Sequence, residues 1–94
     1  MDIIITNWNE SEFSFAFSMT CGKKSALVMP YKTGKVLSGI QIISLNAMHR
    51  VYRGPGRHFA NVDEALKAYR SPEMKAMISH AAQMAREAEE RRAA

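Results

Sequence analysis

Few residues in this 94-residue chain could do chemistry: one cysteine and three histidines. Cys21 is followed by Gly22, Lys23 and Lys24, and neighbouring ammonium groups can lower a thiol pKa. A cysteine nucleophile also needs a base positioned by the fold, and the sequence shows none. We therefore interpret Cys21 as a surface cysteine in a turn.

The histidines form no convincing metal site. His49 and His58 lie on either side of the turn Gly54–Gly56 and could face each other, but two ligands without a third make a poor zinc site. His80 falls between apolar residues of a predicted helix and is interpreted as a boundary residue. There is no phosphate-loop pattern and no credible carboxylate pair. We expect no enzyme activity, no cofactor and no metal.

Charge is distributed unevenly along the chain. The net charge is +4, yet no Asp or Glu occurs between Glu12 and Asp63, an interval that holds seven Lys or Arg. Residues 61–94 carry equal numbers of acidic and basic side chains. A cationic segment of this kind either meets phosphates or an acidic surface, or is ordinary solubility charge at strand ends.

Arginines around the Gly-Pro-Gly turn are the strongest candidates for partner binding. Three of them lie within eight residues with no acid nearby, and the guanidinium group matches phosphate or carboxylate through two parallel hydrogen bonds. The predicted partner-binding residues are Arg50, Arg53, Arg57, His49, His58, Lys23, Lys24, Lys32 and Lys35.

The elements that would position these residues begin with strands. Residues 2–6 predict a short Ile-rich strand, followed by a turn over 7–11. Residues 13–20 alternate strictly, with Phe13, Phe15, Phe17 and Met19 on the core face and small or hydroxylated residues on the other.

Two further strands follow. The turn 21–24 leads into a return strand over 25–31, in which Pro30 predicts an edge or the strand's end. Another strand runs from about Val36 to Leu45, interrupted at Gly39, and residues 49–52 are either a strand or a connection.

Helices complete the chain. Asn61 with Glu64 predicts a helix start, and Ser71-Pro72 predicts a second start, so we expect helices over roughly 62–70 and 72–92. The second helix carries the apolar stripe Met74, Met77, Ile78, Ala81, Met84, Ala85 and Ala88. This stripe is interpreted as core packing, with an adaptable partner surface as the alternative. Residues 86–94 are expected to leave the core and fray.

The fold class is α+β: an antiparallel sheet of three to five strands followed by two helices, the second long and C-terminal. The whole chain, 1–94, forms one domain, with the sheet in about 1–59 and the helices in about 61–92. The first helix would cover Phe13, Phe15 and Phe17. The opposite face would be small, hydroxylated and rimmed with Lys and Arg. A single cysteine and the absence of a signal peptide or membrane span predict the cytoplasm, that of the host cell if the protein is phage-encoded.

Residues 56–69 resemble the sheet-to-helix corner of plant AP2-type and phage integrase arm-binding domains. That resemblance implies a nucleic-acid-binding module in which a basic three-stranded sheet is braced by a helix. The chain lacks the Trp- and Arg-rich strands of those domains, and its cations at turns suit DNA or RNA phosphates better than base edges.

In size, organisation and lack of catalytic residues, the chain is also similar to the accessory proteins of phages and mobile elements, including anti-CRISPR proteins. This resemblance implies an inhibitor that blocks a host nucleoprotein complex by direct protein binding, and we favour it narrowly. We expect the protein to be a monomer, or a homodimer formed through the C-terminal helix, and we expect it not to bind a membrane.

Overall fold

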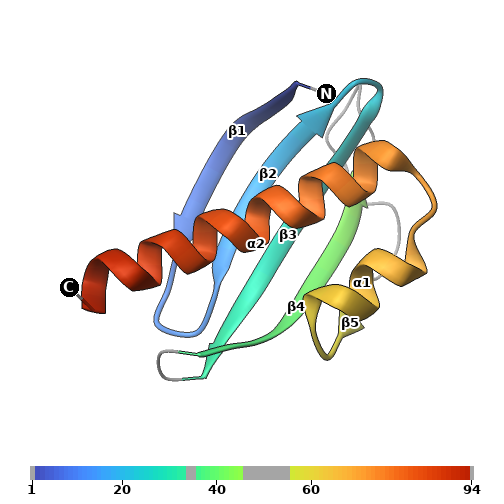
Figure 1. Ribbon diagram of the computed structural model, residues 1–94. Coiled ribbons are helices and arrows are strands. Elements are labelled where there is room, and N and C mark those ends of the chain that lie inside the picture. Colours follow the sequence, from blue (N-terminus) through green and yellow to red (C-terminus); the bar gives the residue numbers. More distant parts are fainter. Residues whose placement is uncertain (1, 34–35, 46–55, 94) are drawn as a thin grey trace.

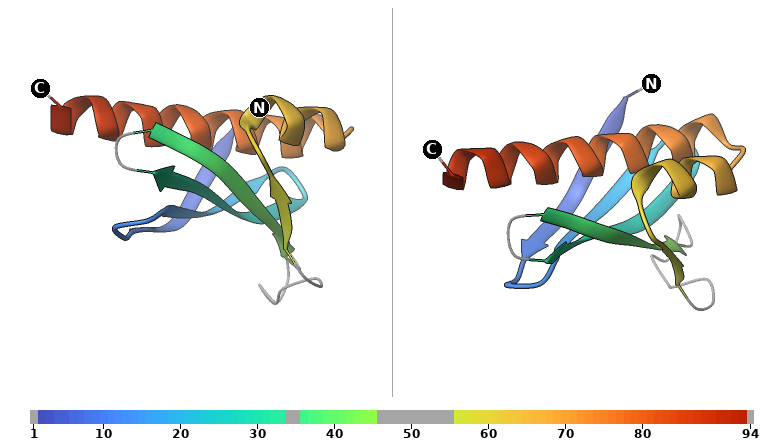
Figure 2. Two further views of the ribbon diagram at one scale, coloured as in Figure 1. Left: turned by 90° about the horizontal axis from the view of Figure 1, so that it is seen from below. Right: turned by 60° about the horizontal axis from the view of Figure 1, so that its bottom comes forward.

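The computed structural model describes residues 2–33, 36–45 and 56–93, and it confirms the α+β class. Five antiparallel strands form one sheet in the order β1-β2-β3-β4-β5, so each strand pairs with its neighbour in the chain. Their bounds are β1 Ile3–Glu10, β2 Phe15–Cys21, β3 Lys24–Thr33, β4 Val36–Leu45 and β5 Arg57–Phe59. Helices α1 Val62–Ala68 and α2 Pro72–Ala93 follow. Both helices lie on the same face of the sheet, with α2 crossing it diagonally (Figures 1 and 2).

The core lies between the sheet and α2. Alternation along β2 buries Phe15, Phe17, Met19 and Cys21, as the sequence pattern predicts for the first three. The α2 stripe packs on this layer, which confirms core packing as its role. Its residues with at most 5 % exposure are Met74, Met77, Ile78, Ala81 and Ala85. The prediction that α1 covers the Phe15 face was wrong, because the longer helix offers the larger apolar surface; α1 lies over β4 and β5 instead.

β1 continues beyond the predicted turn. Its strand runs to Glu10 because a bulge at Thr6 absorbs one extra residue, and the Thr6 hydroxyl donates to the Ser18 carbonyl at 3.1 Å. The turn comes at Ser11–Ser14, where the Ser11 hydroxyl accepts from the Ser14 amide. Phe13 lies in this turn and is 67 % exposed, so its assignment to the core was wrong.

Two further predictions needed correction. Cys21 is 1 % exposed at the end of β2, so it is a buried residue and not a surface cysteine. Pro30 lies within the central strand β3, opposite Ile40 of β4. On its other side β3 pairs with β2 continuously as far as Val28, and then again at one bridge between Tyr31 and Ser14. Pro30 lies between these two paired stretches, so its missing N–H interrupts no continuous ladder there.

Both helix starts are confirmed. The Asn61 side chain accepts from the Glu64 amide at 2.9 Å, and the Ser71 hydroxyl accepts from the Met74 amide at 3.3 Å. α2 begins at Pro72, as predicted, because proline costs no hydrogen bond in the first turn. Ser71 also donates to the Glu73 carboxylate at 2.7 Å, and this bond lowers the pKa of Glu73.

Candidate functional site

The predicted partner-binding residues do not form one surface. Lys23 and Lys24 are exposed at the β2–β3 turn, whereas Arg57 and His58 are exposed on β5. Four of the nine predicted positions, His49, Arg50, Arg53 and Lys35, lie outside the described residues, as does the strand considered at 49–52.

Lys32 is buried, so it does not belong to an exposed cationic surface. Its ammonium lies 3.1 Å from a Glu10 carboxylate oxygen and 3.5 Å from one of Glu89, and it sits 4.5 Å from the centre of the Phe15 ring. These contacts join an edge strand, the central strand and the C-terminal part of α2. The expectation that residues 86–94 leave the core was therefore wrong for Ala88 and Glu89, because Glu89 is held by Lys32 and Ala88 packs against the core.

Arg57 is also engaged within the protein. Its guanidinium lies 5.1 Å from the Phe59 ring centre and 5.3 Å from that of Tyr69, and these two rings meet edge to face. Burial raises the pKa of Tyr69 above its ordinary value, and the Arg57 charge opposes that rise. Arg57 is thus exposed but anchored between β5 and α1.

The sheet face opposite the helices has no helix or strand packed over it among the described residues (Figure 2). Because side chains alternate along each strand, residues adjacent to the buried core positions point to this face. From β2 come Ala16, Ser18 and Thr20, and from β3 come Ser25, Leu27, Met29 and Tyr31. From β1, β4 and β5 come Ile4, Gln41, Ile43 and His58.

We call this set the open face, and its composition differs from the prediction. The small and hydroxylated residues of β2 are present, and Thr20 and Ser25 share a hydrogen bond of 3.0 Å. The central strands add the partly exposed apolar residues Leu27, Met29 and Ile43. Among the described residues of this face there is no Lys, Arg, Asp or Glu, because the strand cations Lys24, Lys32 and Arg57 have the opposite parity and belong to the helix side. Among the described residues, no Lys or Arg therefore points from within this face, whereas the exposed Lys23 and Lys24 lie at its end, in the β2–β3 turn.

A polar cluster lies at the β5 end of the open face. The Tyr31 hydroxyl donates to Gln41 Oε1 at 2.5 Å, and the Tyr31 ring stacks against His58 with centres 6.2 Å apart and an angle of 11°. Sequence reasoning missed Tyr31 and Gln41, although their strand parity could have placed them here once the strand register was known. The cluster offers hydrogen-bonding groups and flat rings beside the apolar residues.

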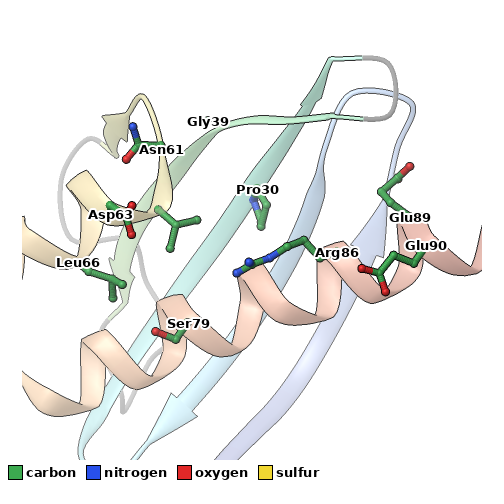
Figure 3. Close-up of a pocket in the computed structure, with 10 residues that line it drawn as sticks. Pro30, Gly39, Asn61, Asp63, Leu66, Ser79, Arg86, Glu89 and Glu90 are labelled. Carbon is green, nitrogen blue, oxygen red and sulfur yellow. The ribbon is translucent and has the colours of Figure 1, made fainter.

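A groove of about 680 Å³ separates α1 from α2 on the other side of the sheet (Figure 3). Pro30 and Gly39 lie at its base, Val62 and Leu66 line the α1 side, and Arg86 extends into it from α2. The Arg86 Nε donates to the Ala82 carbonyl at 3.3 Å, which holds the start of that guanidinium along its own helix. The groove combines a small apolar base with charges of both signs, since Asp63, Glu89 and Glu90 also line it.

Other kinds of site are not assembled in the part of the chain that the structure describes. There, no three His, Cys, Asp or Glu side chains gather as metal ligands would. The described helices include none of the length and apolar character needed to cross a membrane. Comparison with protein-family models, curated proteins and solved structures finds no match to this chain.

Proposed function

We propose that this protein is a small non-enzymatic binding protein that docks on another protein through the open face of its sheet. The observation that carries the proposal is the composition of that face. It offers partly exposed Leu27, Met29 and Ile43 together with the Tyr31 cluster, and its described residues carry no Lys or Arg. An uncharged face with apolar side chains and hydrogen-bonding groups suits the core of a protein–protein interface, where charged residues are depleted.

The same composition argues against phosphates as the main ligand. Proteins that bind nucleic acid neutralise phosphates with Lys and Arg on the contacting surface. Here Lys32 is neutralised inside the protein, and Arg57 is anchored on the helix side. We therefore rank a protein partner above a nucleic acid.

The proposed biological role is that of an inhibitor carried by a phage or another mobile element, which would block a host nucleoprotein complex of the CRISPR–Cas type. Its support is the resemblance in size and organisation to such accessory proteins. In that role the protein would work in the host cytoplasm and would contact the protein part of the complex.

The test combines a cleavage assay with open-face variants. Purified CRISPR–Cas effector complexes of several types are assayed for target cleavage with increasing amounts of the protein. We expect inhibition of at least one complex, and we expect Leu27→Lys and Met29→Lys to remove that inhibition while melting cooperatively. Lys23→Glu combined with Lys24→Glu is the matched control and should inhibit like the wild type. Inhibition that survives both open-face variants would exclude this face, and a lack of inhibition of any complex would exclude the CRISPR–Cas role.

A nucleic-acid-binding module is the second candidate, favoured by the stacked pair Tyr31–His58, since bases stack on such rings. Anisotropy titrations with random single- and double-stranded DNA at several salt concentrations test it. Tight binding with a steep salt dependence would replace our first proposal with this one.

A further inference from the structure

Strand β1 is the long free edge of the sheet. The sheet order leaves its outer side without a neighbouring strand among the described residues, and Figure 1 shows it at the border of the sheet. The opposite edge, β5, has only three residues and lies next to α1. Among the described strands, β1 is therefore the one long edge that remains open.

The backbone groups on this edge can be assigned from the pairing. The Lys32 amide donates to the Phe13 carbonyl, and this pair has the same register as Phe17 with Val28. Backbone groups alternate in direction along a strand, so Phe17 and Met19 direct theirs toward β3. Their β1 partners, Trp8 and Ile5, must then direct their N–H and C=O groups outward, away from the sheet.

The side chains of β1 do little to protect this edge. Proteins blunt free edges with Lys, Pro or very short strands. Residues 3–10 contain no Lys, Arg or Pro, although the bulge at Thr6 twists the edge locally. Two of their large apolar side chains are strongly exposed, Ile4 at 60 % and Trp8 at 58 %.

We propose that β1 pairs antiparallel with β1 of a second copy of this chain, so that two sheets join into one. In this arrangement, residues whose backbone groups point outward lie opposite each other in the two copies. Ile5 lies opposite Trp8 of the second copy, and Ile3 lies opposite its Glu10. Ile4 then lies opposite Asn9 on the open-face side. No residue in this register faces a like charge, and two exposed Trp8 rings gain apolar neighbours.

The second copy is the fitting partner for two reasons. β1 is complementary to itself, and pairing β1 with the three-residue β5 would give few bonds. A β1–β1 contact uses the same surface on both copies and closes at two, whereas a β1–β5 contact would continue into a fibre. Dimerisation through α2, the alternative given above, would have to use the polar side of that helix, because its apolar stripe packs in the core.

Trp8 is the single tryptophan and reports directly on this edge. Sedimentation and tryptophan emission are measured over a dilution series of the intact protein. We expect a dimer that dissociates on dilution, with the emission moving to longer wavelength as Trp8 meets water. A wild type that sediments as a monomer at all concentrations up to the millimolar range would overturn the proposal.

Charge substitutions test the register. Ile4→Lys with Asn9→Lys places like charges opposite each other twice across the dimer axis, and we expect at least about tenfold weaker association. Ile4→Lys with Asn9→Glu places opposite charges there and should restore association to near the wild-type level. Phe13→Lys, in the β1–β2 turn, adds a similar charge at an exposed aromatic residue away from the edge and should leave association unchanged.

A cooperative thermal melt of each variant shows that the fold is intact. Equal association of the two double variants would overturn the register, and undiminished association of both would place the dimer contact elsewhere.

Discussion

Lys32, on the central strand β3, holds its ammonium 3.1 Å from the Glu10 carboxylate at the end of edge strand β1. Glu89 of α2 approaches the same ammonium at 3.5 Å. The chain brings these residues together from three distant positions, and the Lys32 side chain is only 5 % exposed. Two carboxylates around one buried ammonium mean that removing the cation leaves like charges close to each other.

Removing this cation should therefore destabilise the fold. We expect Lys32→Ala to lower the free energy of unfolding by about 2–4 kcal/mol, because the truncation removes a buried cation that contacts two carboxylates. Lys23→Ala, at an exposed turn, should change it by no more than about 0.5 kcal/mol. Urea unfolding of both variants measures the difference, and equal midpoints would show that the ion pair adds nothing to stability.

Phe15 and Phe13 provide a matched pair for the core. Phe15 is fully buried, whereas Phe13 is 67 % exposed two residues earlier. We expect Phe15→Ala to cost about 3–5 kcal/mol of unfolding free energy as a core truncation. Phe13→Ala should cost less than about 1 kcal/mol. Thermal melts of the two variants decide, and a comparable loss in both would contradict the assignment of Phe13 to an exposed turn.

The C-terminal part of α2 should matter for stability up to Glu89. A chain that ends after Met84 loses the buried Ala85, the packed Ala88 and the Glu89 carboxylate, and we expect it to be less stable by about 2–4 kcal/mol. A chain that ends after Glu90 keeps all three and should melt like the full protein. If the shorter chain also melts like the full protein, the last turns of α2 are not part of the core.

Arg57 should influence the ionisation of Tyr69. The pKa of Tyr69 is raised by burial and lowered by the Arg57 charge, so Arg57→Gln should raise it further. The pKa of Tyr69 is near 10 in the unfolded chain and higher in the folded protein. Its contribution to stability is therefore complete below pH 10 and is lost as the pH rises through the pKa of the folded state. Stability of the variant should therefore fall more steeply above pH 10.

Absorbance titration of the phenolate measures this change, and Tyr69→Phe identifies the signal. An unchanged Tyr69 titration in Arg57→Gln would contradict the contact between the two side chains. Loss of the cation–π contacts should also cost about 0.5–1 kcal/mol at neutral pH, so reversing the charge of Arg57 is not neutral for the fold.

The sequence alone was sufficient where the cause is local. The alternation of β2 predicts its buried face, and Asn61 and Ser71 predict the helix starts, because a two-residue period and a capping side chain act within a few residues. The α2 stripe predicts core packing for the same reason, although not which sheet residues it meets.

Tertiary structure decided what depends on neighbours distant in the chain. Lys23 and Lys32 look alike in the sequence, but only Lys32 has Glu10 and Glu89 brought against it under α2. The bulge at Thr6 sets the parity that places Trp8 opposite Phe17, where the two rings stack. The strand register places Tyr31, Gln41 and His58 together on the open face. Such placements follow from which strands pair and which face the helices cover, and long-range packing selects both.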